Sequence, residues 1–120
     1  MAHRPDDIYA LHLRVLQFGL SVCRALRTLD RDLVVDHFVL QLCRSASSPG
    51  ANYGEARAAE SKRDFIHKMQ ICLKEFRETD FWLLFIGGLT GLDCSHLRAE
   101  CNELTAIFVA SIKTAKRRAD

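Results

Sequence analysis

Apolar residues recur along the chain at the alternating three- and four-residue spacing of an amphipathic helix. The first segment carries a seam of seven such positions, Ile8, Leu11, Val15, Phe18, Val22, Ala25 and Leu29. This spacing keeps the seam on one face and predicts a helix packed along it. A second seam beside it consists of Tyr9, Leu13, Leu16, Leu20 and Cys23. Two adjacent seams make an arc too wide for one neighbour, so this helix should touch two helices or a partner subunit.

Three more segments repeat the spacing. Their expected inward positions are Val35, Phe38, Leu42 and Ala46 in the second, Phe65, Met69, Cys72, Phe76, Thr79, Leu83 and Ile86 in the third, and Leu97, Cys101, Leu104, Phe108, Ile112 and Ala115 in the fourth. The candidate N-caps are Asp30 or Asp32, then Ser61 in a capping box, then Asp93 or Ser95. Gly87-Gly88 is expected to end the third helix.

Pro49 is the ambiguous point of the second segment. It either begins a new helix at the first turn or kinks one long helix that runs on toward Ala59. A polar stripe continues across it, made of Gln41, Ser45, Ser48, Asn52 and Glu55. This continuity favours the kinked helix. We then expect Asn52 and Glu55 to be buried against the third helix, in a network with Lys68, Glu75, Glu78 and Thr79 that sets helix register.

The pattern predicts an all-α fold, an antiparallel up-down four-helix bundle formed by residues 1–120 as a single domain. Helices of roughly 25 residues are about 37 Å long, and short connections make consecutive helices antiparallel neighbours. The chain has 120 residues, 48% of them hydrophobic, which suits one domain with a real core.

Five cysteines lie in apolar stretches without a CxxC pair, which indicates buried free thiols. The N-terminus lacks the apolar core of a signal peptide, and the run FWLLFI is too short to span a membrane. A cytoplasmic location and no contact with membranes are therefore expected.

The net charge of +2 is unevenly placed. Residues 113–120 have a net charge of +3, so the net charge of the other 112 residues is −1. Two basic groups result, the stripe Arg63, His67, Gln70, Lys74 and Arg77 along the third helix, and the C-terminal group Lys113, Lys116, Arg117 and Arg118. Such stripes bind phosphate backbones, although they are also ordinary solvated helix faces. RNA or DNA is thus a candidate partner.

The sequence offers little sign of catalysis. Glu75 and Glu78 share a helix face, but a di-metal bundle also needs Glu-x-x-His motifs, which do not occur. Cys94, His96 and Cys101 match no common zinc spacing. GGLTGL lacks the ending of a phosphate-binding loop. We expect no enzyme activity, no metal and no cofactor.

The central segment carries a family resemblance. It contains Ser47, Ala51, Asn52, Glu55 and Ala56, then Ser61, Asp64, Phe65 and Lys68, then Leu73, Lys74, Glu75, Glu78, Thr79, Trp82 and Leu83. Together these motifs resemble the four-helix-bundle proteins encoded in intervening sequences of bacterial 23S rRNA genes. Cys72, where the family usually has alanine, and Pro49-Gly50 depart from the pattern.

The resemblance implies a bundle that assembles into a barrel-like homopentamer. A related branch, the accessory proteins of diversity-generating retroelements, binds nucleic acid and a reverse transcriptase. The resemblance contributes no catalytic residues. The expected oligomer interface comprises Tyr9, Leu13, Leu16, Leu20, Phe81, Trp82 and Phe85, whose apolar area exceeds what one core covers. The leading hypothesis is a homo-oligomeric RNA-binding module, and the alternative is a scaffold for another protein, such as a polymerase.

Overall fold

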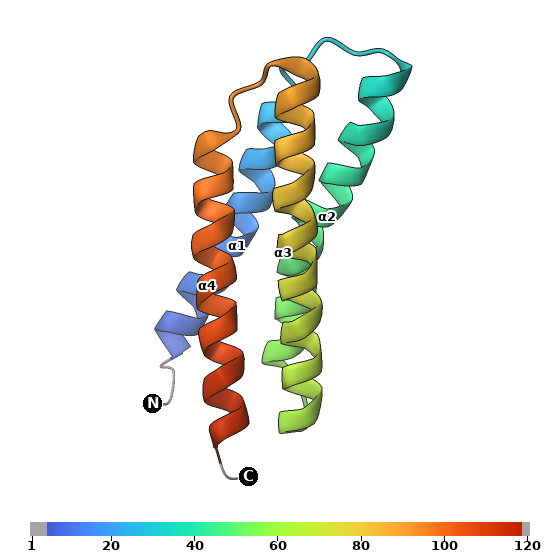
Figure 1. Ribbon diagram of the computed structural model, residues 1–120. Helices are drawn as coiled ribbons and strands as arrows, with labels where there is room; N and C mark the ends of the chain where they lie inside the picture. Colours follow the sequence, from blue (N-terminus) through green and yellow to red (C-terminus); the bar gives the residue numbers. More distant parts are fainter. Residues whose placement is uncertain (1–4, 119–120) are drawn as a thin grey trace.

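The computed structural model describes residues 5–118, which form four helices and no strand. These are α1 (Pro5–Leu26), α2 (Leu33–Arg57), α3 (Lys62–Thr90) and α4 (Ser95–Arg117). Each helix runs antiparallel to the next and packs against it, and α1 also lies beside α4 (Figure 1). The expected antiparallel up-down four-helix bundle is confirmed. None of the helices in the described part of the chain is long and apolar enough to cross a membrane.

The four seams meet along the bundle axis. Val22, Leu42, Phe76 and Phe108, one from each helix, are completely buried. Burying a side chain of this kind contributes about 1.5–3 kcal/mol relative to leaving it exposed. The α1 seam departs from expectation at its end, where the core position belongs to Leu26 and not to Ala25. A strict seven-residue repeat drifts around a helix of 3.6 residues per turn, and the four-residue step corrects this drift.

The N-terminal ends of α2 and α3 are capped as the sequence predicts. The Asp32 carboxylate accepts a hydrogen bond from the Val35 backbone N–H at 2.9 Å. The Ser61 hydroxyl accepts one from the Asp64 N–H at 3.0 Å. Each bond satisfies a backbone donor that the helix itself leaves unpaired. Both helices therefore begin where local sequence chemistry places them.

The junction between α3 and α4 differs from the sequence prediction. α3 does not end at Gly87-Gly88 but continues to Thr90, and Gly91 closes it with a positive φ of 80°. A Cβ on Gly87 would lie 3.2 Å from the Leu92 carbonyl oxygen, so this glycine admits the returning loop rather than stopping the helix. Neither predicted cap of α4 occupies the N-cap position, which falls to Cys94.

α2 is continuous through Pro49, which confirms the one-helix interpretation of this segment. Proline has no N–H to donate, so the carbonyl one turn earlier loses its usual helical partner. The carbonyl groups around this point take side-chain donors from neighbouring helices. His12 Nε2 donates to the Gly50 carbonyl at 3.0 Å, and the Cys72 thiol approaches the Pro49 carbonyl at 3.6 Å. Contacts from α1 and α3 thus converge on the turn of α2 that contains Pro49.

Candidate nucleic-acid interface

The basic stripe lies along the outer face of α3. Arg63, His67, Gln70, Lys74 and Arg77 are all exposed. They point outward because the α3 seam turns the opposite face of the helix into the core. From its first to its last residue the stripe covers roughly 21 Å of helix. It is long enough to follow several phosphates of a nucleic-acid strand.

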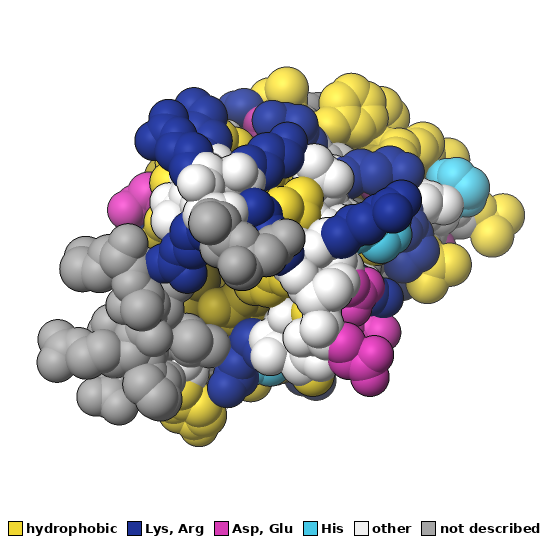
Figure 2. Space-filling view, turned by 90° about the horizontal axis from the view of Figure 1, so that it is seen from below, with side chains coloured by type: hydrophobic (Ala, Val, Ile, Leu, Met, Phe, Trp, Pro, Cys, Tyr) yellow, Lys and Arg dark blue, Asp and Glu magenta, His cyan; other side chains and the backbone are white. Residues whose placement is uncertain are grey.

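The C-terminal basic group lies at the end of the bundle where α3 begins. Lys113, Lys116 and Arg117 are exposed at the end of α4. The Lys62 ammonium donates to the Arg118 backbone carbonyl, which ties the start of α3 to the end of α4. Figure 2 views the molecule from this end and shows Lys and Arg side chains over much of the described surface, with Asp and Glu toward its margins.

The structure therefore brings only part of the predicted basic set together. Arg63 and His67 share the end of the bundle with the α4 group, whereas Lys74 and Arg77 lie farther along α3. Arg57 also belongs to this end, because α2 finishes there. Sequence reasoning missed Arg57, since nothing in the spacing along α2 indicates which other helix ends lie beside it. We call these residues, Arg57, Arg63, His67, Lys113, Lys116, Arg117 and Arg118, the basic end.

The exposed cations of α3 and α4 differ from the paired arginines elsewhere in the described chain. Arg14 contacts Glu100 at 2.6 Å, and Arg98 contacts Asp80 at 3.0 Å. By contrast, no ion pair with the described side chains is formed by Arg63, Lys74, Arg77, Lys113, Lys116 and Arg117. Their charge is not neutralised by the described protein and remains available to an anionic ligand.

A polar contact joins α2 to α3 inside the bundle. Ser45 and Thr79 are completely buried, and the Thr79 hydroxyl lies 3.0 Å from Ser45 Oγ. The Ser45 hydroxyl in turn donates to the Leu42 carbonyl at 3.2 Å. Both hydroxyls are therefore satisfied, as burial of polar groups requires. This part of the expected network sets the two helices in register.

The expectation for Asn52 and Glu55 is met only in part. Glu55 forms the expected ion pair with Lys68 of α3, at 3.6 Å, but its side chain is 60% exposed and not buried. Asn52 is half-buried, and its amide donates to the backbone carbonyl and hydroxyl of Ser48, both at 3.0 Å, within its own helix. The amide therefore takes a partner one turn back in α2 in place of a group on α3. Glu55 lies at the outer margin of the α2–α3 contact, where water solvates the carboxylate.

Arg44 is the partner that sequence reasoning missed. Its guanidinium bonds Glu78 and lies 3.7 Å from Glu75 Oε2. The indole N–H of Trp82 also donates to Glu78, at 3.3 Å. Glu75 Oε2 is buried and has no hydrogen-bond partner in the described part of the chain. The two glutamates thus face an arginine.

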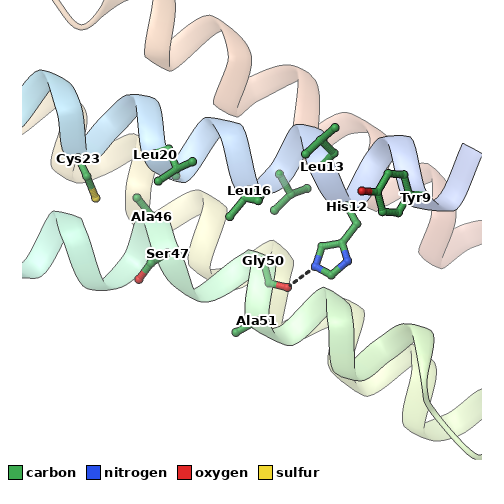
Figure 3. A pocket seen from close by; sticks show the side chains of 12 residues that line it. Tyr9, His12, Leu13, Leu16, Leu20, Cys23, Ala46, Ser47, Gly50 and Ala51 are labelled. Atoms are coloured by element: carbon green, nitrogen blue, oxygen red, sulfur yellow. Dashed lines mark hydrogen bonds between the residues drawn. The ribbon is translucent and has the colours of Figure 1, made fainter.

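Two apolar surfaces remain uncovered on the single chain. On α1 the second seam is exposed except at Cys23, which is half-buried, and its residues border a groove of about 390 Å³ against α2 (Figure 3). Around α3, Phe81 is 55% exposed and Phe85 38% exposed. Phe85 packs on Phe38 of α2 with ring centroids 4.4 Å apart, and Trp82 lies 5.7 Å from the same ring. The groove and this aromatic patch contain all seven predicted interface residues.

The cysteine side chains are thiols. Burial raises the pKa of Cys72 and of Cys101 to about 12, so neither forms a thiolate near neutral pH. Cys94 is buried, whereas His96 is exposed. Among the described residues no group of three His, Cys, Asp or Glu side chains is placed to hold a metal ion.

The comparisons with known proteins agree with this architecture. A solved structure described as a protein with unknown function from the S23 ribosomal protein family of Bacteroides thetaiotaomicron is 27% identical, with a TM-score of 0.75. The match covers 88% of this chain and 97% of that one. No curated protein matches the chain significantly. The family model of the 23S rRNA-intervening sequence protein matches residues 13–110. The chain belongs to the 23S rRNA-intervening sequence protein family.

Proposed function

We propose that this protein is a non-enzymatic, homo-oligomeric module that binds nucleic acid, RNA in particular, through the basic end and the α3 stripe. The carrying observation is that six exposed cations form no ion pair with the described residues: Arg63, Lys74 and Arg77 of α3, and Lys113, Lys116 and Arg117 of α4. A cation without a carboxylate partner can bind a phosphate directly, because no ion pair within the protein has to be broken first. Binding through phosphates releases counterions and is independent of sequence.

RNA is favoured over DNA by the names of the related proteins. The matching family is that of the 23S rRNA-intervening sequence protein, and the similar structure is assigned to an S23 ribosomal protein family. Both names refer to ribosomal components. The proposed contacts of the α3 stripe go to the phosphate backbone.

Self-association is the second part of the proposal. The α1 groove and the aromatic patch present apolar area that a soluble surface rarely leaves open. The family resemblance suggests a ring of five. In a ring each weak patch of cations is repeated, and avidity multiplies modest affinity. Light scattering should give five times the 13.6 kDa mass of one chain. A mass of 13.6 kDa at micromolar concentration would refute self-association.

Charge reversal tests the nucleic-acid contact. Lys74→Glu with Arg77→Glu should weaken binding to mixed-sequence RNA about equally for every sequence. Each lost phosphate contact should reduce the log–log salt slope by about 0.7 for single strands and 0.9 for duplex DNA. The matched control is Arg24→Glu with Arg27→Glu, which changes the same charge at exposed residues near the opposite end of the bundle. Equal losses from both pairs would mean that net charge alone, not the stripe, governs binding.

The alternative function is a scaffold or accessory subunit for another protein, such as a reverse transcriptase or other nucleic-acid enzyme. The exposed aromatic rings of Phe81 and Phe85 favour it, because aromatic side chains often anchor protein interfaces. The titration that tests RNA binding also separates the two functions. An intact oligomer that binds neither RNA nor DNA at about 50 mM salt would favour the scaffold.

A further inference from the structure

A second cavity, of about 600 Å³, opens at the basic end. All four helices or their ends contribute to it. Leu11 of α1 and Phe65 of α3 form an apolar part of its wall, and Tyr53 of α2 adds a second aromatic ring to the lining. Ser111 and Thr114 of α4 line the side formed by that helix. The volume is within the range of small-molecule sites, which are mostly apolar with a few placed polar groups.

The hydroxyl groups of this cavity differ from those of the threonines elsewhere in α3 and α4. Thr79, Thr90 and Thr105 each donate to the carbonyl four residues earlier in their own helix, at 2.7 to 2.8 Å. Ser111 and Thr114 form no such bond and have no other hydrogen-bond partner among residues 5–118. Both residues are half-buried, and neither hydroxyl is among the enclosed oxygen atoms, so both are reachable from the cavity. These two hydroxyls therefore retain both donor and acceptor capacity toward the cavity.

Tyr53 provides the strongest sign of a ligand. The residue is only 5% exposed, but its hydroxyl is not among the enclosed oxygen atoms and has no hydrogen-bond partner in the described part of the chain. The ring is held edge-on between His12 and Phe108, each with its centroid 5.4 Å away. Burial raises the pKa of the Tyr53 hydroxyl, which keeps it protonated as a donor. A well-fixed donor in a cavity with no internal acceptor is suited to an acceptor on a ligand.

Arg57 joins the cavity to the basic end. It lines the cavity, is exposed, and uses one N–H to reach His12 Nδ1 at 2.8 Å. A guanidinium carries five N–H donors, so the others can meet a phosphate at the mouth of the cavity. The ligand implied by these groups has a flat apolar body, an edge that hydrogen-bonds, and an adjacent anion.

We infer that this cavity accepts an unpaired nucleobase whose phosphate binds Arg57, so that single-stranded nucleic acid is the preferred ligand. The inference rests on the proposed function and adds its ligand class. Hydroxyl groups both donate and accept, so they tolerate any base edge, and the site prefers unpaired bases without reading sequence. A base held in a duplex cannot enter. The same chemistry occurs in a base within a strand and in a free mononucleotide.

The test compares three labelled ligands of equal phosphate number by fluorescence anisotropy at about 50 mM salt. They are a single-stranded RNA, an abasic strand of the same length, and a duplex. The natural strand should bind about tenfold more tightly than the abasic strand, in the range that contact with one base contributes. Equal affinity for all three would overturn the cavity inference and leave the proposed function standing. Absence of binding to all three would refute both.

Variants locate the effect. Tyr53→Phe with Thr114→Val removes two hydroxyls at constant shape and should abolish most of the difference between natural and abasic strands. The matched control is Thr105→Val, which removes a hydroxyl of α4 that is bonded to its own helix at 2.8 Å. Ser111→Leu, which fills the cavity, should act like the double variant. If the double variant and Ser111→Leu both kept the full difference in affinity between the natural and the abasic strand, the inference would be overturned. Excess adenosine monophosphate should compete if a free mononucleotide is the ligand, and should not if the strand is required.

Discussion

Gly19 and Gly88 are both helical glycines, and alanine at the two positions should change stability in opposite directions. Gly19 is buried where α1 meets α2, and a Cβ there would lie 2.9 Å from the Ala46 carbonyl oxygen. That oxygen belongs to the α2 backbone and cannot yield without moving the helix. On Gly88 a Cβ would meet nothing within 4 Å.

Two terms decide each result. In a helix interior alanine is favoured over glycine by about 0.8–1.0 kcal/mol, and this term applies to both positions. Overpacking a close contact costs about 1–3 kcal/mol, and only Gly19 incurs it. Gly88→Ala should therefore stabilise the fold by about 1 kcal/mol, while Gly19→Ala should range from neutral to about 2 kcal/mol destabilising. The difference between the variants isolates the clash.

Equilibrium unfolding in urea measures both free energies, with light scattering used to verify that the oligomeric state is the same in each variant. The slope of unfolding free energy against urea should not change, because neither substitution alters the buried area substantially. If Gly19→Ala stabilised the protein as much as Gly88→Ala, the close approach of α1 to α2 at this point would be refuted.

Three further changes test other contacts. Thr79→Val keeps the side-chain shape but removes its buried hydroxyl, and should lower the unfolding free energy in urea by about 0.5–1.5 kcal/mol. Arg14→Met removes the partly exposed pair with Glu100, and should cost about 1 kcal/mol at low salt and less at about 1 M salt, where screening weakens the pair. Cys72 and Cys101 have a pKa near 9.0 when unfolded and about 12 when folded, so the unfolded thiols lose protons first. The contribution of the two protonated thiols to the free energy of unfolding is intact below pH 9 and is lost between about pH 9 and about pH 12. Urea titrations across this range should show a shallower decline when both are alanine, and an identical decline would contradict this assignment.

The α3 seam illustrates how far local pattern carries. Met69, Cys72, Phe76, Leu83 and Ile86 are all buried as their spacing predicts. Helical periodicity depends only on neighbours in the chain, so a sequence shows directly which residues share a face. The N-caps of α2 and α3 were predictable for the same reason, because the bonds of Asp32 and Ser61 reach only three residues along the chain.

The end of α3 illustrates where local pattern fails. A glycine pair usually predicts the end of a helix, yet α3 continues to Thr90 and is closed by Gly91. Gly87 instead leaves room for the backbone of the following loop at Leu92. Likewise, Asn52 satisfies its amide within its own helix, although its stripe pointed toward α3. The end of α3 depended on how the folded loop returns past Gly87, a distance that chain spacing does not contain. Asn52, by contrast, took a partner four residues back in its own helix.

The sequence by itself determined that this protein is a helical bundle and which faces of its helices are apolar, because 3.6-residue periodicity and capping are local properties. Tertiary structure alone decided that Arg57 joins the basic residues of α3 and α4 at one end, and that Arg44 faces Glu75 and Glu78. It also decided that Tyr53, Phe65 and Thr114 enclose one cavity. These groupings depend on the side-by-side packing of residues far apart in the chain, which is set by the fit of whole helices to one another.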